Sequence, residues 1–131
     1  YNCESPDLLV IQVHRIHDDA VPTSVHEIHN RLSEISQNAC LTREMRAIAF
    51  ITTLIDNGTI APNALKRLYM HQIRDDDFFG SLERDIGYIA DPEFLKYMYD
   101  AGFKMGTKWL KENFDAIGVR TTASIEADYL S

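Results

Sequence analysis

Histidines and carboxylates gather in the first third of the chain, where their types allow metal chemistry. The residues concerned are His14, His17, Asp18, Asp19, His26 and His29. Imidazole and carboxylate groups are common metal ligands, and dipeptides such as His17-Asp18 serve metal-dependent phosphohydrolases. The chain has no H-E-x-x-H, no E-x-x-H pair and no closely spaced quartet of Cys and His. We therefore interpret these histidines as partly exposed structural residues, with a helical metal-dependent phosphohydrolase as the weaker alternative.

A serine nucleophile needs a sharp turn beside backbone amides that can hold an oxyanion, and the G-x-S-x-G pattern supplies both. None of the six glycines lies in such a pattern, and Gly80-Ser81 lacks the second glycine. A glycine-rich phosphate loop is also absent from the sequence. The chain is therefore predicted to hold no catalytic, cofactor-binding or metal-binding residue, and to need no cofactor.

Composition places the chain in the globular class. It has 131 residues, 45% of them hydrophobic, and a formal net charge of −7. That is enough to build a core, and it lacks the basic surface that nucleic-acid binding needs. Cys3 and Cys40 show neither a disulfide framework nor zinc spacing, which leaves a reduced compartment or a lone bridge open. No apolar run is long enough to span a membrane, and no signal peptide is recognisable.

The run over residues 7–13 is apolar and β-branched, which is typical of a strand covered on both faces in a mostly parallel sheet. Its neighbours are scarce, because the rest of the chain offers one short strand at about residues 66–73. We therefore expect residues 1–131 to form a single C-terminal segment of a larger domain. An unpaired edge on strand 7–13 would tend to self-associate.

Two consecutive helices are expected after the first loop, over about residues 24–38 and 41–57. Ser24 and Glu27 form a capping-box pattern at the start. Apolar residues at steps of three and four make the first helix amphipathic, and Asn38-Ala39 interrupts or bends the pattern. The second helix is apolar on almost every side, which predicts that it is buried.

The remaining elements are expected to be mostly helical. They cover about residues 92–113 and 122–130, after a helical turn near 75–77 and an irregular segment at 86–90. Asp91-Pro92 is a strong helix start, and Thr121-Thr122 is expected to cap the last helix. Gly102 and Gly106 form a G-x-x-x-G in the long helix, which predicts close packing against a neighbouring element. The predicted fold class is α/β and predominantly helical.

Five segments together give the chain a family resemblance. They are 30–36 (NRLSEIS), 43–50 (REMRAIAF), 54–58 (LIDNG), 68–73 (LYMHQI) and 109–118 (WLKENFDAIG). In this order they resemble the C-terminal part of bacterial patatin-like phospholipases. The opening segment 5–13 resembles the family strand that follows the catalytic aspartate region.

The resemblance implies an α/β lipid acyl hydrolase with a Ser-Asp dyad, acting on a lipid or acyl ester. The family's G-x-S-x-G serine and its Asp-Gly-Gly or Asp-Gly-Ala aspartate would lie upstream of Tyr1, and the chain contains no Asp-Gly dipeptide. Residues 1–131 would then supply a core strand and covering helices, and would be inactive alone. The alternative is a self-standing helical interaction or regulatory module without hydrolytic activity.

Overall fold

The computed structural model describes residues 3–18, 20–61, 64–82 and 91–130. In chain order the elements are β1 (Asp7–Ile11), α1 (Val25–Asp56), β2 (Tyr69–Ile73), α2 (Asp76–Ser81), α3 (Pro92–Asn113), the 3₁₀ turn η2 (Phe114–Ala116) and α4 (Ile125–Tyr129). The chain is mostly helical with a small parallel sheet, which confirms the predicted mixture of strand and helix. The irregular segment predicted at 86–90 lies outside the described residues.

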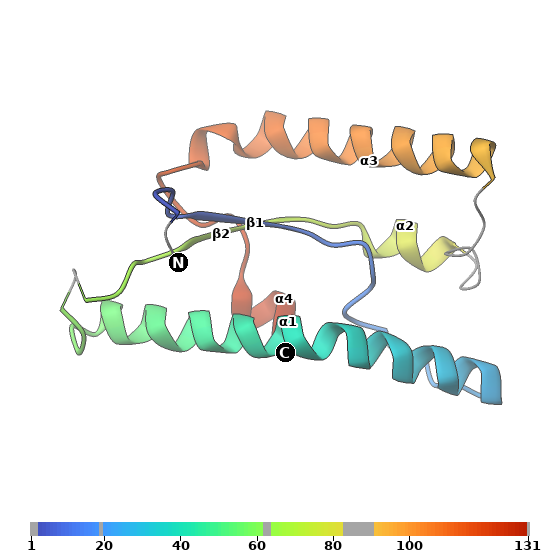
Figure 1. The fold of residues 1–131 in the computed structure, drawn as a ribbon, viewed down its shortest axis with the longest axis horizontal. Coiled ribbons are helices and arrows are strands. Elements are labelled where there is room, and N and C mark those ends of the chain that lie inside the picture. The colour runs from blue at the N-terminus through green and yellow to red at the C-terminus, as the bar shows by residue number, and fades with distance from the viewer. Residues whose placement is uncertain (1–2, 19, 62–63, 83–90, 131) are drawn as a thin grey trace.

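β1 and β2 form a parallel pair joined by α1. Asp7 pairs with Tyr69 and Ile11 with Ile73, so the parallel pairing predicted for the first strand is confirmed. Each strand is five residues long, which is shorter than the predicted ranges 7–13 and 66–73. Figure 1 shows three layers, with α1 and α4 on one side of the sheet and α3 on the other.

β1 is not covered on both faces, and the prediction of a buried strand is wrong. Leu9 is 43% exposed and Ile11 is 66% exposed. The reason is that, among the described residues, β2 is the one strand that pairs with β1. In β2, by contrast, Met70 and His71 point to opposite faces and are both 1% exposed. β2 is therefore the buried strand of the sheet, and β1 is the exposed one.

The segment between α3 and α4 caps the outer edge of β2. The amides of Thr122 and Ala123 donate to the carbonyl oxygen of Met70 at 2.9 and 3.1 Å, and the amide of Met70 donates to Thr121 Oγ1 at 3.2 Å. These threonines therefore bond to the sheet instead of capping a helix. As a result α4 begins after Ser124, its N-cap, later than the predicted range of 122–130.

α1 is one continuous helix, not the two helices predicted over residues 24–38 and 41–57. The predicted capping box at Ser24 is confirmed. The expected interruption at Asn38 is absent because its side chain donates to the carbonyl oxygen of Arg15 at 2.7 Å instead of competing for the helix backbone. No glycine or proline occurs within α1, so the ordinary causes of a kink are missing.

The second half of α1 is not buried, contrary to the prediction from its apolar circumference. Met45 is the one buried residue described in α1, and Phe50 is 63% exposed. Length explains the difference. A helix of 32 residues is about 48 Å long, whereas a strand of five residues spans about 17 Å. The sheet is therefore too short to cover α1 from end to end.

The hydrophobic core lies between α1, the sheet and α4. Its buried members are Met45, Met70, Ile125 and Tyr129. Val10 of β1 and Leu41 and Ile48 of α1 pack against them and remain partly exposed. This small core holds α4 and α1 on the same side of the sheet.

α3 begins and runs as predicted. Asp91 accepts a hydrogen bond from the amide of Phe94 at 3.0 Å, and proline occupies the first turn. The predicted inner face is the partly buried one, and it consists of Phe94, Met98, Ala101, Met105 and Trp109. Close packing at Gly102 and Gly106 is not found, since a Cβ at either position would meet none of the described atoms within 4 Å. None of the described helices is both long and apolar enough to cross a membrane.

Candidate functional site

The histidines and carboxylates that suggested a metal site do not come together. His14, His17, His26 and His29 are all exposed. His17 Nε2 lies 3.1 Å from the carbonyl oxygen of Asp128. Asp18 instead pairs with Arg15 at 2.8 Å, and Asp19 lies outside the described residues. Among the residues described, no three or more potential ligands form a metal-binding group.

A polar cluster lies between the sheet and α3. His71 of β2 is its centre, with Nε2 3.0 Å from Asp7 Oδ1 of β1 and Nδ1 2.9 Å from Thr122 Oγ1. The Trp109 ring packs edge-on against the imidazole, with the ring centroids 5.6 Å apart. Sequence reasoning missed this cluster because its members lie 64 and 51 residues from His71, a separation that leaves no local pattern.

Asp7 receives three hydrogen bonds in this cluster. Besides His71, the amide of Gly118 donates to Oδ1 at 2.7 Å and the hydroxyl of Ser5 donates to Oδ2 at 3.0 Å. These bonds, with the Gly118 amide first, favour the ionised carboxylate and lower the pKa of Asp7 below its ordinary value of 3.8. Gly118 has a φ of +74°, a conformation that favours glycine.

An ionised Asp7 fixes the tautomer of a neutral His71. The carboxylate can only accept, so His71 Nε2 carries the hydrogen and Nδ1 accepts from the hydroxyl of Thr122. This order of carboxylate, imidazole and hydroxyl matches the spacing of an orienting acid, a base and a nucleophile. The cluster therefore has the arrangement of side chains that a catalytic site needs.

Two observations argue against catalysis by this cluster. The imidazole is buried, and an attacking hydroxyl needs amide donors for the oxyanion that forms. The amides of Thr122 and Ala123, which lie beside that hydroxyl along the chain, both donate to Met70. The cluster instead clamps β1, β2 and the segment before α4 together, and we call it the His71 clamp.

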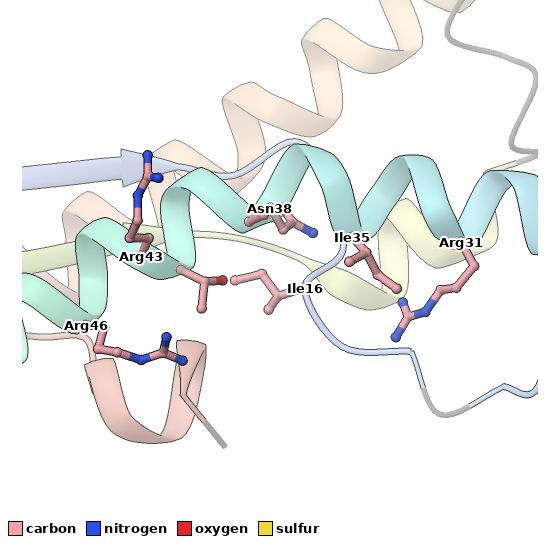
Figure 2. Close-up of a pocket in the computed structure, with 8 residues that line it drawn as sticks. Ile16, Arg31, Ile35, Asn38, Arg43 and Arg46 are labelled. Carbon is pink, nitrogen blue, oxygen red and sulfur yellow. The ribbon is translucent and has the colours of Figure 1, made fainter.

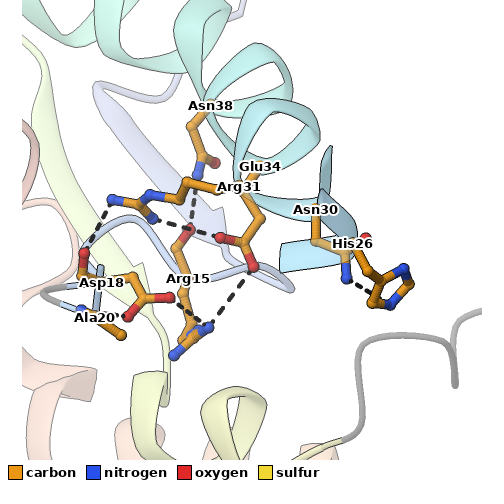
Figure 3. A network of polar contacts seen from close by, with 8 residues as sticks. All are labelled: Arg15, Asp18, Ala20, His26, Asn30, Arg31, Glu34 and Asn38. Carbon is orange, nitrogen blue, oxygen red and sulfur yellow. Dashed lines mark hydrogen bonds and ion pairs between the residues drawn. The ribbon is translucent and has the colours of Figure 1, made fainter. Parts of the chain in front are cut away.

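A second polar network ties the β1–α1 loop to α1 (Figure 3). Arg15 pairs with Asp18 at 2.8 Å and lies 3.7 Å from Glu34. Arg31 lies 3.4 Å from Glu34 and donates to the carbonyl oxygen of Asp18 at 3.1 Å. Both arginines are therefore neutralised by nearby carboxylates. Asn38 extends the network through the carbonyl oxygen of Arg15.

An open groove of about 350 Å³ runs along α1 beside this network (Figure 2). Its lining consists of Ile16, Arg31, Ile35, Asn38, Ala39, Thr42, Arg43 and Arg46. Arg43 and Arg46 make no side-chain hydrogen bond or ion pair within the part of the chain that the structure describes. The groove is therefore neutral at the Arg31 end and cationic at the other.

No protein-family model, no curated protein and no solved structure matches this chain. Its function is therefore inferred from its own segments and contacts.

Proposed function

We propose that this chain is the C-terminal structural portion of a patatin-like serine lipid acyl hydrolase, inactive without an upstream catalytic portion of the same protein. The ordered segments that resemble this family support the proposal. They fall mainly on α1, β2 and the end of α3, the elements that form and cover the sheet. In this role the upstream portion supplies the serine and the aspartate, and residues 1–131 supply a strand and the helices around it.

The open edge of β1 is the observation that carries this proposal. The amide of Gln12 donates to β2 and the carbonyl of Pro6 accepts from it, so even-numbered residues of this segment face β2. Because backbone groups alternate in direction along a strand, Leu9 and Ile11 turn theirs to the open edge. β2 is already capped, which leaves β1 as the edge that a further strand can join.

The side chains of β1 favour an α/β partner over a lone strand. Leu8 and Leu9 point to opposite faces, and both are exposed. Covering apolar side chains on both faces requires a strand that brings helices on both sides, as parallel strands in α/β domains do. The catalytic portion of an α/β hydrolase has this architecture.

A self-standing interaction module without catalytic activity is the alternative. One face of α3 and of the η2 turn that follows it favours this alternative, with an exposed apolar stripe made of Leu95, Tyr99, Phe103, Leu110 and Phe114. Gly102 and Gly106 lie along the same stripe, where a partner helix would approach closely. In this alternative, a second copy of the chain would cover the edge of β1, and no catalytic portion would be needed there.

The coding sequence before Tyr1, together with an activity assay, tests the proposal. We expect a G-x-S-x-G motif and, nearer to Tyr1, an Asp-Gly-Gly or Asp-Gly-Ala motif. The whole gene product should hydrolyse p-nitrophenyl acyl esters, and residues 1–131 alone should not. Turnover by the purified 131-residue chain would contradict the proposal. Absence of both motifs would favour the interaction module, and a concentration-dependent dimer would then be expected.

A further inference from the structure

The groove on α1 has an unusual charge arrangement at one end. Arg43 and Arg46 are three positions apart, so they are neighbours on the helix surface, where like charges repel each other. Neither side chain is paired within the described residues. The whole chain carries a net charge of −7, so this cationic end is not part of a generally basic surface. An anion bound there would relieve the repulsion.

The opposite end of the groove offers no second anion site. Arg31 already lies 3.4 Å from Glu34 and donates to the carbonyl oxygen of Asp18 at 3.1 Å. Between the two ends the lining is mostly apolar, with Ile16, Ile35 and Ala39 beside the side-chain amide of Asn38, which donates to the carbonyl oxygen of Arg15. The helix rises about 12 Å from Ile35 to Arg43. The groove thus pairs one cationic end with a mostly apolar strip of that length.

A change of rotamer would bring the two arginines to one anionic group. Figure 2 shows their side chains extending in different directions from α1. Both residues are exposed, and exposed side chains change rotamer within picoseconds to nanoseconds. Guanidinium groups hold phosphate or carboxylate oxygens through paired hydrogen bonds, and the hydroxyl of Thr42 in the same lining adds a donor.

We propose that this groove binds a small amphipathic anion. A phosphate or carboxylate group lies between Arg43 and Arg46, and an alkyl chain lies over Ala39, Ile35 and Ile16. The site goes beyond the proposed acyl hydrolase role, because it uses no residue of the β1 edge and needs no catalytic portion. Its failure would leave that role untouched.

Calorimetric titration of the full-length protein with decyl phosphate, below its micelle concentration, tests this site. Inorganic phosphate measures the affinity of the head group alone. Decyltrimethylammonium measures the affinity of the same alkyl chain attached to a positively charged head group. We expect decyl phosphate to bind at least about tenfold more tightly than inorganic phosphate, because the alkyl chain buries apolar surface. Decyltrimethylammonium should not bind at this site. Equal affinity for the two amphiphiles would overturn the proposal.

Variants assign the binding to the groove. The double variant Arg43→Gln/Arg46→Gln should weaken decyl phosphate binding about tenfold through loss of the charged hydrogen bonds. Ile35→Ser should weaken decyl phosphate but not inorganic phosphate. Arg120→Gln, at an exposed arginine between α3 and α4, is the matched control and should bind as the parent does. Unchanged affinity in the double variant would end the proposal.

Chemical protection gives a second result that does not depend on a variant's folding. Phenylglyoxal modifies exposed arginines, and mass spectrometry of the unsubstituted protein locates each modified residue. Decyl phosphate should protect Arg43 and Arg46 and leave Arg120 reactive. Equal reactivity of all three residues with and without decyl phosphate would contradict binding in the groove.

Discussion

Of the two strands in the sheet, the more polar one, β2, is buried, and the more apolar one, β1, is exposed. β1 reads Asp-Leu-Leu-Val-Ile and is largely exposed, whereas β2 reads Tyr-Met-His-Gln-Ile and has its centre fully buried. Apolar composition therefore did not decide which strand is covered in this chain. Neighbours decided it, because β2 has β1 on one side and the segment 121–123 on the other.

Burial of the polar strand is possible because its polar side chains have partners. His71 bonds to Asp7 and Thr122, and Gln72 donates to Gln12 at 2.9 Å. Buried polar groups with partners avoid the penalty of lost hydration. The apolar side chains of β1 lack a comparable cover among the described residues.

Truncation of one apolar side chain on each strand should give the largest contrast. Met70→Ala removes a fully buried side chain of β2 and should lower the free energy of unfolding by about 2–5 kcal/mol. Ile11→Ala, on the exposed part of β1, should lower it by less than about 1 kcal/mol. Urea denaturation followed by circular dichroism measures both. Equal losses would show that β1 is as enclosed as β2.

Proline substitution separates the two edges of β1. Val10→Pro removes an amide that faces β2 and should lower the free energy of unfolding by about 1–3 kcal/mol. Leu9→Pro removes an amide at the open edge, so the 131-residue chain should tolerate it better. In a form that includes the proposed upstream portion, Leu9→Pro should lower the free energy of unfolding by more than it does in the 131-residue chain. A Leu9→Pro loss that is identical in both forms would argue against a strand on this edge.

Acid should loosen the His71 clamp through Asp7. The pKa of Asp7 is lowered in the fold by the Gly118 amide and by His71, so the unfolded chain takes up a proton more readily than the folded one. The stabilisation is present above the unfolded pKa, about 3.8, and is lost as the pH falls through the lower folded value.

Asp7→Asn should flatten this pH dependence. The measurement is the urea midpoint between about pH 2 and pH 6 for the parent and the variant. Glu112→Gln, which changes an exposed carboxylate of α3, is the control and should keep the parent's curve. Parallel curves for the parent and Asp7→Asn would contradict the role of Asp7 in the clamp.

The smallest effect is expected from removal of the buried hydroxyl of Tyr129. Tyr129 of α4 is buried in the core and its hydroxyl has no hydrogen-bond partner among the described residues. Burial raises the pKa of this hydroxyl. Tyr129→Phe should therefore leave the free energy of unfolding unchanged or raise it by up to about 1 kcal/mol. Tyr97→Phe on the exposed face of α3 is the control, and a marked loss in Tyr129→Phe alone would reveal a partner for the hydroxyl.

Local signals predicted the starts of α1 and α3 correctly. The Ser24 capping box and the Asp91-Pro92 start were read directly from short spacings, and both are present. The break at Asn38 was predicted wrongly, because its side chain has a partner 23 residues away that no local pattern indicates. The same limit applies to the cap on β2, where the threonines expected to start a helix bond to the sheet.

The amino-acid pattern was enough to locate the strands and the starts of the long helices, and the apolar run 7–13 indicated a parallel sheet. These properties depend on spacings of a few residues, on caps and on runs of apolar residues. Only the tertiary structure decided that the polar strand is buried and the apolar strand exposed, and that Asp7, His71 and Thr122 meet. Burial and pairing depend on which distant segments become neighbours, and short-range spacing does not encode that.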